Sequence, residues 1–487
     1  MMKPLLKKLA MSLSLLIVVL LVSHCNSGST SQLGHEDPED PNIVAQIDQY
    51  IFTRAELEKK LLQEIVPDPY NDSITESEQV DAKSVLLEMI AEKAMIIVAR
   101  NQGYLEDEKT YAPVKNYKER NLRILLLQNY LKDMKDKVIA TEAEIEKRMQ
   151  ADPNSDRNRV KAILENTKKR ELISQYYNQL HQKFHIKKLS ENFPKAIKIH
   201  DRLLNHPKTP QRMKFIRKNQ ISDEMTPEER GIILATFDNG QVTLEDWLYT
   251  LCESSPPSRP KNLNTTKGIE QLLDRTLMLS IYLTEAKLQN LDKDEEFLKK
   301  LREYEDRILF GSVYREKYKQ IKEPTEDEII AYFNKNKKAF RSMKIDQIWC
   351  EDLKTARQAK KELDDGKDFE SVRQEFSLIK KLQASTASPK NQGVFWNDLW
   401  KAEPNDIVGP MKGFYGRQIK WRIVKILEKN PDEIEEYSED IKGMLKDSMM
   451  SERREAIIAD YGRQLLKKYP YKIYTDRIKN IDPLDIQ

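Results

Sequence analysis

The sequence repeats itself, and this repeat constrains the possible folds more than any other feature. Residues 45–53 and residues 235–243 align without a gap, and each segment reads as an alternating apolar strand followed by a turn. Each segment ends in a threonine, Thr53 or Thr243, placed to cap the helix that follows. We therefore expect two copies of a unit that begins with a strand, a turn and a helix.

Further matches follow in the same order along the two copies. An apolar helical stripe at residues 89–96 corresponds to one at 272–279, and residues 141–145 correspond to 325–329. In the last pair a threonine is followed three residues later by a glutamate, which is the pattern of a capping box. Coincidental similarity between helices could explain any single match. A series of matches in one order favours duplication.

The two copies then diverge, because the second contains an insertion. The first copy continues into a helix predicted over residues 157–184 and a strand-like segment at 185–187, whereas the second resumes only at 441–465 and ends at 471–474. The prediction is a mainly α-helical protein in which an inserted α+β domain interrupts the second of two helical modules. The expected boundaries are module 1 at 43–194, a connection at 195–230, the first part of module 2 at 231–342, the inserted domain at 343–430, and the helix and strand that complete module 2 at 431–487.

The N-terminus reads as an export signal. Three lysines precede an apolar run at residues 9–22, which is shorter than a comfortable membrane-spanning helix. The segment Leu21-Val22-Ser23-His24-Cys25 resembles the lipobox of bacterial lipoproteins, with His24 in place of the usual small residue. The resemblance implies a signal peptide at 1–24, a lipid on Cys25 and a flexible tether at 25–42. Ordinary signal cleavage, with Cys25 as an incidental thiol, is the alternative.

The expected location is therefore outside the cytoplasm, on a bacterial membrane and on its periplasmic side, with the inner face of the outer membrane favoured. Lys and Arg number 82 and Asp and Glu 79, and the three lysines of the signal account for the difference. A neutral mature chain predicts no nucleic-acid partner. Six histidines, three cysteines and no nucleotide- or metal-binding motif predict neither a metal nor another cofactor. Cys252 and Cys350 could pair or remain free thiols.

The insertion differs from the rest of the chain in composition and predicted structure. It holds most of the tryptophans and two strand-like runs. Its order of elements resembles a parvulin-type (PpiC) peptidyl-prolyl isomerase domain. The resemblance rests on a strand at 345–350, a helix at 354–363, the turn Gly366-Lys367-Asp368-Phe369, a second helix ending at Phe376-Ser377, the run 404–410, and Gly413-Phe414-Tyr415-Gly416 before a last strand at 419–427.

The catalytic features of that family are degenerate here. Parvulins usually place one histidine on the first strand and one on the last, and these positions hold Gln347 and, as predicted, Gln418. Glutamine can form hydrogen bonds but does not titrate. The interval between Trp396 and Pro404 is too short for the family's pocket-forming helix. We expect weak or absent isomerase activity and no confident catalytic residue, with an active isomerase as the alternative.

Aromatic side chains gather in the same part of the insertion. They are candidates for a groove that accepts an extended peptide, because aromatic-lined sites commonly bind such segments. The simpler alternative is that they fill the core of a small domain. The candidates are Phe395, Trp396, Trp400, Phe414 and Tyr415.

The flanking helical modules resemble the chaperone part of the SurA/PrsA family of periplasmic foldases, which also opens with a turn and a helix and closes with a helix after the isomerase domain. The resemblance covers nearly all of residues 43–475. It implies a membrane-tethered chaperone or foldase that binds unfolded or nascent exported polypeptides. The second alternative is an interaction lipoprotein with a single partner.

Overall fold

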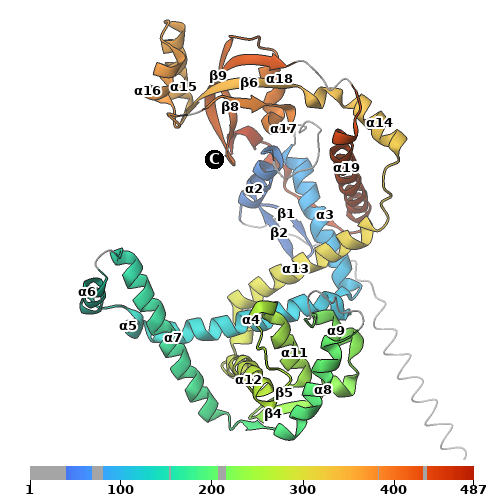
Figure 1. Ribbon diagram of the computed structural model, residues 1–487. Helices are drawn as coiled ribbons and strands as arrows, with labels where there is room; N and C mark the ends of the chain where they lie inside the picture. The colour runs from blue at the N-terminus through green and yellow to red at the C-terminus, as the bar shows by residue number, and fades with distance from the viewer. Residues whose placement is uncertain are drawn as a thin grey trace, which may run out of the picture. The chain divides into compact units, whose positions relative to one another are not determined.

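The computed structural model describes residues 40–67, 81–152, 155–206, 215–381, 383–430 and 436–486. The predicted signal peptide and Cys25 therefore lie outside the described residues. The chain is mainly α-helical, with small antiparallel sheets and one inserted α+β domain, which confirms the predicted fold class (Figure 1). It divides into two compact units. The central unit runs from Gly103 to Leu309, and the discontinuous unit contains the residues up to Gln102 and those from Phe310 onward.

The central unit is built around the small sheet of the second copy, in the order β3 (Lys187–Lys188), β4 (Ile233–Phe237) and β5 (Gly240–Thr243). One large core, centred on fully buried side chains such as Trp247, joins this sheet to the surrounding helices. The helices of the unit are α4 (Glu108–Asp133), α5 (Lys135–Val138), α6 (Glu142–Ala151), α7 (Arg157–Lys183), α8 (Phe193–Leu204), α9 (Lys218–Glu224), α10 (Pro227–Arg230), α11 (Leu244–Glu253) and α12 (Thr266–Leu288).

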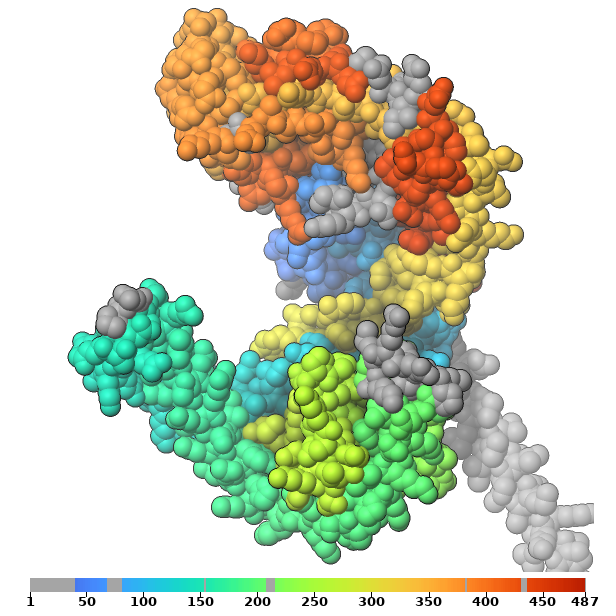
Figure 2. All heavy atoms as spheres, viewed as in Figure 1, coloured from blue at the N-terminus to red at the C-terminus, as the bar shows by residue number. Residues whose placement is uncertain are grey.

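An arm projects from the rest of the central unit. It consists of α5, α6 and the first turns of α7, and it stands out at one end of the unit in the space-filling view (Figure 2). Its own small core contains Ala140, Ile145 and Val160. Ile139 and Ile163 beside this core remain 54% and 50% exposed, so the arm presents apolar side chains to solvent.

The discontinuous unit contains the sheet of the first copy, in the order β10 (Tyr471–Ile473), β1 (Ile43–Ile47) and β2 (Tyr50–Thr53). Helix α13 (Glu295–Tyr318) contains the boundary between the two units. The other helices of the unit outside the inserted domain are α2 (Arg54–Ile65), α3 (Ala82–Asn101), α14 (Glu326–Lys335), α19 (Glu439–Leu466) and α20 (Thr475–Ile478).

These units differ from the expected modules, because each sheet combines the hairpin of one copy with the terminal strand of the other. Ala45 of β1 pairs with Ile473 of β10, and Lys187 of β3 pairs with Thr236 of β4. The physical reason is that the two hairpins are equivalent: both carry the same register shift at the start of the first strand and the same burial pattern. Either terminal strand fits either hairpin, so the expected module 1 at 43–194 is divided between the two units.

Local helix signals are confirmed. Threonine forms a capping box at the start of α2, α6, α11 and α14, through Thr53, Thr141, Thr243 and Thr325.

Helix α19, predicted as the return of the second copy, packs on α3 and α14. It approaches α3 closely at Gly462, where a Cβ atom would lie 2.9 Å from the Cβ of Ala91. The crossing therefore requires the absence of a side chain at this position.

The inserted domain has one four-stranded antiparallel sheet in the order β7-β6-β9-β8. Its elements are β6 (Ser342–Cys350), α15 (Leu353–Asp364), α16 (Phe369–Phe376), β7 (Ser385–Ala387), α17 (Pro389–Gln392), η6 (Gly393–Phe395), α18 (Trp396–Trp400), β8 (Ile407–Tyr415) and β9 (Gln418–Asn430). Helices α15 and α16 cover one face, and α17 to α18 cover the other. The short interval after Trp396 holds a single helical turn, α18.

Cys252 and Cys350 are both free thiols, which answers the question of their pairing. Burial raises the pKa of Cys252, and it raises the pKa of Cys350 to about 11.

Among the described residues, no helix combines the length and the apolar character needed to cross a membrane. The same residues contain no group of three His, Cys, Asp or Glu side chains that could hold a metal ion.

Candidate functional site

Alternation along β6 places Gln347 on the sheet face that is covered by α17 to α18. Met343 and Ile345 on this face pack against Trp396, whereas Ile348 and Cys350 face α15 and α16. Gln347 comes after Met343 and Ile345 along β6 and lies on the same face of the sheet. It is only 8% exposed. A buried amide must find hydrogen-bond partners, and this requirement defines the rest of the site.

The partner of Gln347 on the last strand is Arg422. Trp349 and Arg422 are opposite each other in the β6–β9 ladder. Nη1 of Arg422 donates to Oε1 of Gln347 at 2.7 Å, and Nε2 of Gln347 donates to Oγ of Ser385 at 3.4 Å. The centre of the inserted domain is therefore an amide and a guanidinium.

The structure does not bring Gln418 to this centre. Gln418 is exposed, lies at the first position of β9 and pairs with Tyr415 across the hairpin. Arg422, which does lie at this centre, was not predicted from the sequence. A signal for Arg422 was present, because this cation interrupts a strand otherwise rich in buried apolar residues, Ile423, Val424 and Ile426.

Arg422 is enclosed by aromatic rings and by the backbone of β8. Its guanidinium carbon lies 5.2 Å from the ring centre of Trp349 and 6.0 Å from that of Phe395. A Cβ atom on Gly413 would lie 2.2 Å from Nε of Arg422, so only glycine leaves room for the guanidinium. Burial lowers the pKa of Arg422 to about 9, and the group therefore stays charged at neutral pH.

The five aromatic candidates fall into two groups. Trp396 is buried in the core of the inserted domain and stacks on Trp400 at 5.1 Å between ring centres. The other three lie near Arg422: Phe395 contacts Phe414 at 4.8 Å, and Tyr415 contacts Trp349 at 5.4 Å. Phe414 and Tyr415 are half-buried and thus accessible from outside. Burial differs within both groups: Trp396 and Phe395 are buried, whereas Trp400 is half-buried like Phe414 and Tyr415. A binding surface is therefore open to members of both groups.

A small cavity lies beside this second group. It measures about 370 Å³ and is lined by Ser388, Asn391, Phe414 and Gly416 of the inserted domain and by Pro67 after α2. Its wall mixes one aromatic ring with hydroxyl and amide groups. Such a wall suits a peptide segment, which presents both apolar and hydrogen-bonding groups.

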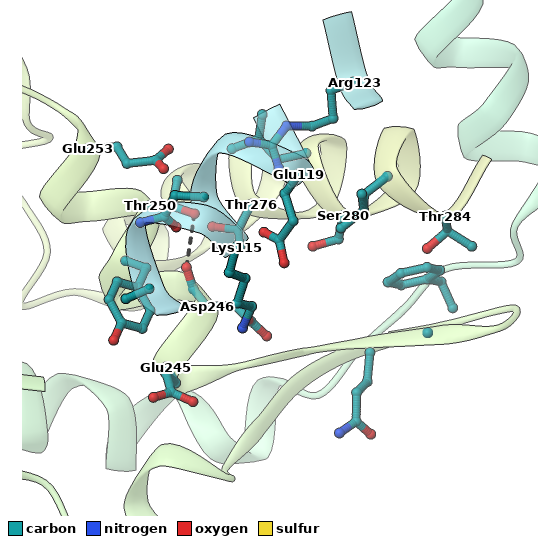
Figure 3. A pocket seen from close by; sticks show the side chains of 18 of the residues that line it. Lys115, Glu119, Arg123, Glu245, Asp246, Thr250, Glu253, Thr276, Ser280 and Thr284 are labelled. Atoms are coloured by element: carbon teal, nitrogen blue, oxygen red, sulfur yellow. Dashed lines mark hydrogen bonds between the residues drawn. The ribbon is translucent and has the colours of Figure 1, made fainter. Parts of the chain in front are cut away.

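The central unit holds a second candidate, a polar cleft between α4, α11, α12 and β5 with a volume of about 440 Å³ (Figure 3). Hydroxyl groups of Thr276, Ser280 and Thr284 follow one face of α12, and carboxylates of Glu119 and Glu253 lie across from them (Figure 3). Burial lowers the pKa of Arg123 in the same cleft, against the attraction of Glu253 and Glu119. This cleft was not predicted from the sequence, although the spacing of the three hydroxyl residues on α12 is helical.

The chemistry available at the inserted domain is hydrogen bonding and charge, without proton transfer. Neither Gln347 nor Arg422 changes protonation near neutral pH. An amide and a guanidinium can hold a polar group of a ligand, but they cannot replace a pair of titrating imidazoles. Fold and site together define a mainly helical protein whose inserted α+β domain has an amide and a guanidinium at its polar centre.

Comparison with known proteins found similarity over parts of the chain. No family model matches the chain. The foldase protein PrsA of Caldanaerobacter subterraneus subsp. tengcongensis is 24% identical over 241 residues, and the match covers 43% of this chain and 72% of that protein. The matched segment thus spans less than half of this chain.

Solved structures of the same class are also similar to parts of the chain. PrsA of Streptococcus pneumoniae is 14% identical, with 40% of this chain and 77% of that chain covered and a TM-score of 0.25. PrsA of Bacillus anthracis is 18% identical, with 38% and 86% covered and a TM-score of 0.22. One of the SurA-like chaperones PEB4 and Cj1289 of Campylobacter jejuni is 18% identical, with 43% and 85% covered and a TM-score of 0.21.

Proposed function

We propose that the protein is an exported, lipid-tethered chaperone of the PrsA/SurA type that binds unfolded or nascent exported polypeptides. We further propose that its parvulin-like domain binds peptides and does not isomerise them efficiently. The observation that carries the second statement is the hydrogen bond between Gln347 and Arg422, because it fills the polar centre with groups that do not titrate. The match to PrsA supports the first statement.

Two surfaces of the central unit support polypeptide binding. The lining of its cleft includes five carboxylates and two cations, which favours segments with basic side chains; the charged groups are Glu108, Glu119, Glu245, Asp246, Glu253, Lys115 and Arg123. The arm adds the exposed apolar side chains of Ile139 and Ile163. A chaperone needs both features, because its clients expose apolar and charged groups together.

Site-specific photo-crosslinking tests polypeptide binding. A crosslinking amino acid at Gln241, which is exposed and lines the cleft, should capture many unrelated exported proteins. The matched control is Arg170, an exposed position on α7 outside the cleft, which should capture few. Capture of one protein alone would favour the interaction lipoprotein, and equal capture at both positions would contradict a binding cleft.

A prolyl isomerisation assay tests the second statement. We expect the full chain to accelerate exchange of an alanyl-prolyl peptide far less than an ordinary parvulin, since each tenfold loss needs only about 1.4 kcal/mol at the transition state. Gln347→His alone should not restore activity, because Arg422 still occupies the partner position. A rate close to that of ordinary parvulins would instead make the protein an active isomerase.

A further inference from the structure

Arg422 is the most deeply buried charged side chain among the residues that the structure describes, at 1% exposed. Its Nη1 is satisfied by Gln347, whereas Nε and Nη2 have no hydrogen-bond partner within the part of the chain that the structure describes. These two nitrogens share one edge of the planar guanidinium. Arginine binds carboxylates through two parallel hydrogen bonds from such an edge. The free edge is thus already arranged for a two-oxygen acceptor.

The carboxylates of neighbouring segments are already paired with other cations. Asp346, next to Gln347, pairs with Arg373, and Glu351 after β6 pairs with Lys420 at 2.7 Å. Asp485 near the C-terminus pairs with Lys412 of β8. A buried charge without a counter-ion is costly, and removing water from the guanidinium is the cause of its lowered pKa. The fold therefore maintains a charge that nothing within the described chain neutralises.

We propose that the free edge of Arg422 is a receptor for a carboxylate of a bound polypeptide, an inference that rests on the proposed function. The rings of Trp349 and Phe395 flank the guanidinium and exclude water, which strengthens its attraction for an anion. A planar carboxylate matches the free edge in shape and charge. A phosphate dianion is more strongly hydrated and would lose more on entering between two aromatic rings.

Tyr415 offers a route to the receptor, because its ring contacts Trp349, which lies beside the guanidinium. It is half-buried, contacts Trp349 at 5.4 Å and ends β8 next to the exposed turn at Gly416 and Arg417. The contact between the rings of Tyr415 and Trp349 is worth about 1 kcal/mol. Rotation of the Tyr415 side chain toward solvent is therefore cheap compared with the attraction of a buried cation for a carboxylate.

The carboxylate could belong to an acidic side chain or to a chain terminus, and peptide pairs separate these sources. The probes are alanine hexapeptides: one blocked at both ends with a central glutamate, its glutamine counterpart, and one without glutamate that has a free C-terminus, with its amide counterpart. Binding to the full chain is followed by calorimetry and by tryptophan fluorescence, since Trp349 lies beside the guanidinium. We expect the carboxylate member of at least one pair to bind at least tenfold more tightly than its neutral counterpart.

Two substitutions distinguish binding from a structural role. Gln347→Glu supplies an internal carboxylate at the position that already contacts Arg422, so it should abolish the preference for charged peptides while raising the melting temperature. Arg422→Met should also abolish the preference, and the fold should tolerate it because a buried charge is removed. The matched control is Arg417→Met, an exposed arginine in the adjacent turn, which should leave the preference unchanged.

Several outcomes would overturn the receptor. Equal binding within both peptide pairs, or a preference that survives Gln347→Glu, would show that Arg422 has no role in recognition. Binding of inorganic phosphate in place of the peptides would assign a different ligand. A failed receptor remains distinguishable from a failed chaperone, because crosslinking at Gln241 reports on the central unit and does not involve Arg422.

Discussion

Ala45 and Ile473 are partners in one antiparallel ladder, although they lie near opposite ends of the described chain. Two further contacts reinforce this closure: the backbone N–H of Tyr474 donates to the carbonyl of Val44 at 2.9 Å, and Nη1 of Arg477 donates to the carbonyl of Ile43 at 2.7 Å. The discontinuous unit is thus completed by its last strand, and the hairpin of the first copy depends on residues at the end of the second.

Deleting residues 471–487 should destabilise the discontinuous unit and leave the central unit intact, because β10 pairs with β1 of the discontinuous unit. We expect hydrogen exchange at residues 43–53 to accelerate at least tenfold, with residues 233–243 of the equivalent hairpin as the internal control. Mass spectrometry of the exchanged peptides measures both. Loss of protection at 233–243 would show that the terminal strand serves its own copy.

Excising residues 343–429 should leave both helical units folded. Ser342 and Asn430 are partners at the base of the inserted sheet, so a short linker can join them. Helices α14 and α19 keep their shared core of Ile329, Phe333, Leu445 and Met449. Circular dichroism should show retained helix and a melting temperature within a few degrees of the intact chain. General unfolding would mean that the inserted domain is required for the helical scaffold.

Gly462→Ala should destabilise the crossing of α3 and α19 by about 1–3 kcal/mol, because the new methyl group would lie 2.9 Å from the Cβ of Ala91. Gly443→Ala in the same helix is the matched control, since nothing lies within 4 Å of its Cβ position. That control should gain about 0.5–1 kcal/mol from helix propensity. Adding Ala91→Gly should rescue the first variant, and a failure to rescue it in chemical denaturation would contradict the assigned contact.

Glu92→Gln should stabilise the discontinuous unit at neutral pH. Burial raises the pKa of Glu92, against the attraction of Lys60 and Lys93. Because the folded-state pKa lies above the unfolded one, the native state holds its proton more tightly, and ionisation as the pH rises costs stability. The melting temperature of the variant should exceed that of the wild type at pH 7, and the difference should vanish below about pH 4.5.

The matched control for Glu92 is Glu58→Gln on α2, where the carboxylate pairs with Arg54 at the surface. Surface pairs contribute little, so this change should leave the melting temperature nearly unchanged at both pH values. A stabilisation by Glu92→Gln that persisted at pH 4 would rule out ionisation as its cause.

Replacing Cys25 by alanine should release the protein from membranes without changing its melting temperature. The prediction rests on the lipobox-like segment at residues 21–25. Cell fractionation and incorporation of a labelled fatty acid measure it, with Cys252→Ala as the control thiol. A variant that stays in the membrane fraction, together with a wild type that takes up no label, would contradict lipidation at Cys25.

Local features of the fold were predictable from the sequence because they depend on neighbouring residues. The capping boxes at Thr141 and Thr325 require only a threonine and a glutamate three residues later, and both are present in the structure. The two strands and two helices of the inserted domain were predicted within a few residues for the same reason. Turns, helix caps and hydrophobic periodicity depend on residues that are close together in the sequence. They can therefore be recognised from the sequence directly.

The exchange of terminal strands and the position of Arg422 were not predictable in the same way. Both hairpins offer the same backbone groups and the same burial pattern, so pairing of β10 with β1 depends on the tertiary arrangement. Gln418 and Arg422 both lie on the last strand. Only the register of that strand against β6 shows which of them faces Gln347.

The pairing of β1 with β10 also sets an order of events during synthesis. The central unit is contiguous, and all of its elements have left the ribosome when Leu309 appears. The hairpin at residues 43–53 is made first, yet its last partner strand arrives only with Tyr471 to Ile473. Domains generally fold as they emerge, and contacts between distant segments form late. This protein therefore spends most of its own translation with an incomplete N-terminal sheet, in the condition of the unfinished chains that it is proposed to protect.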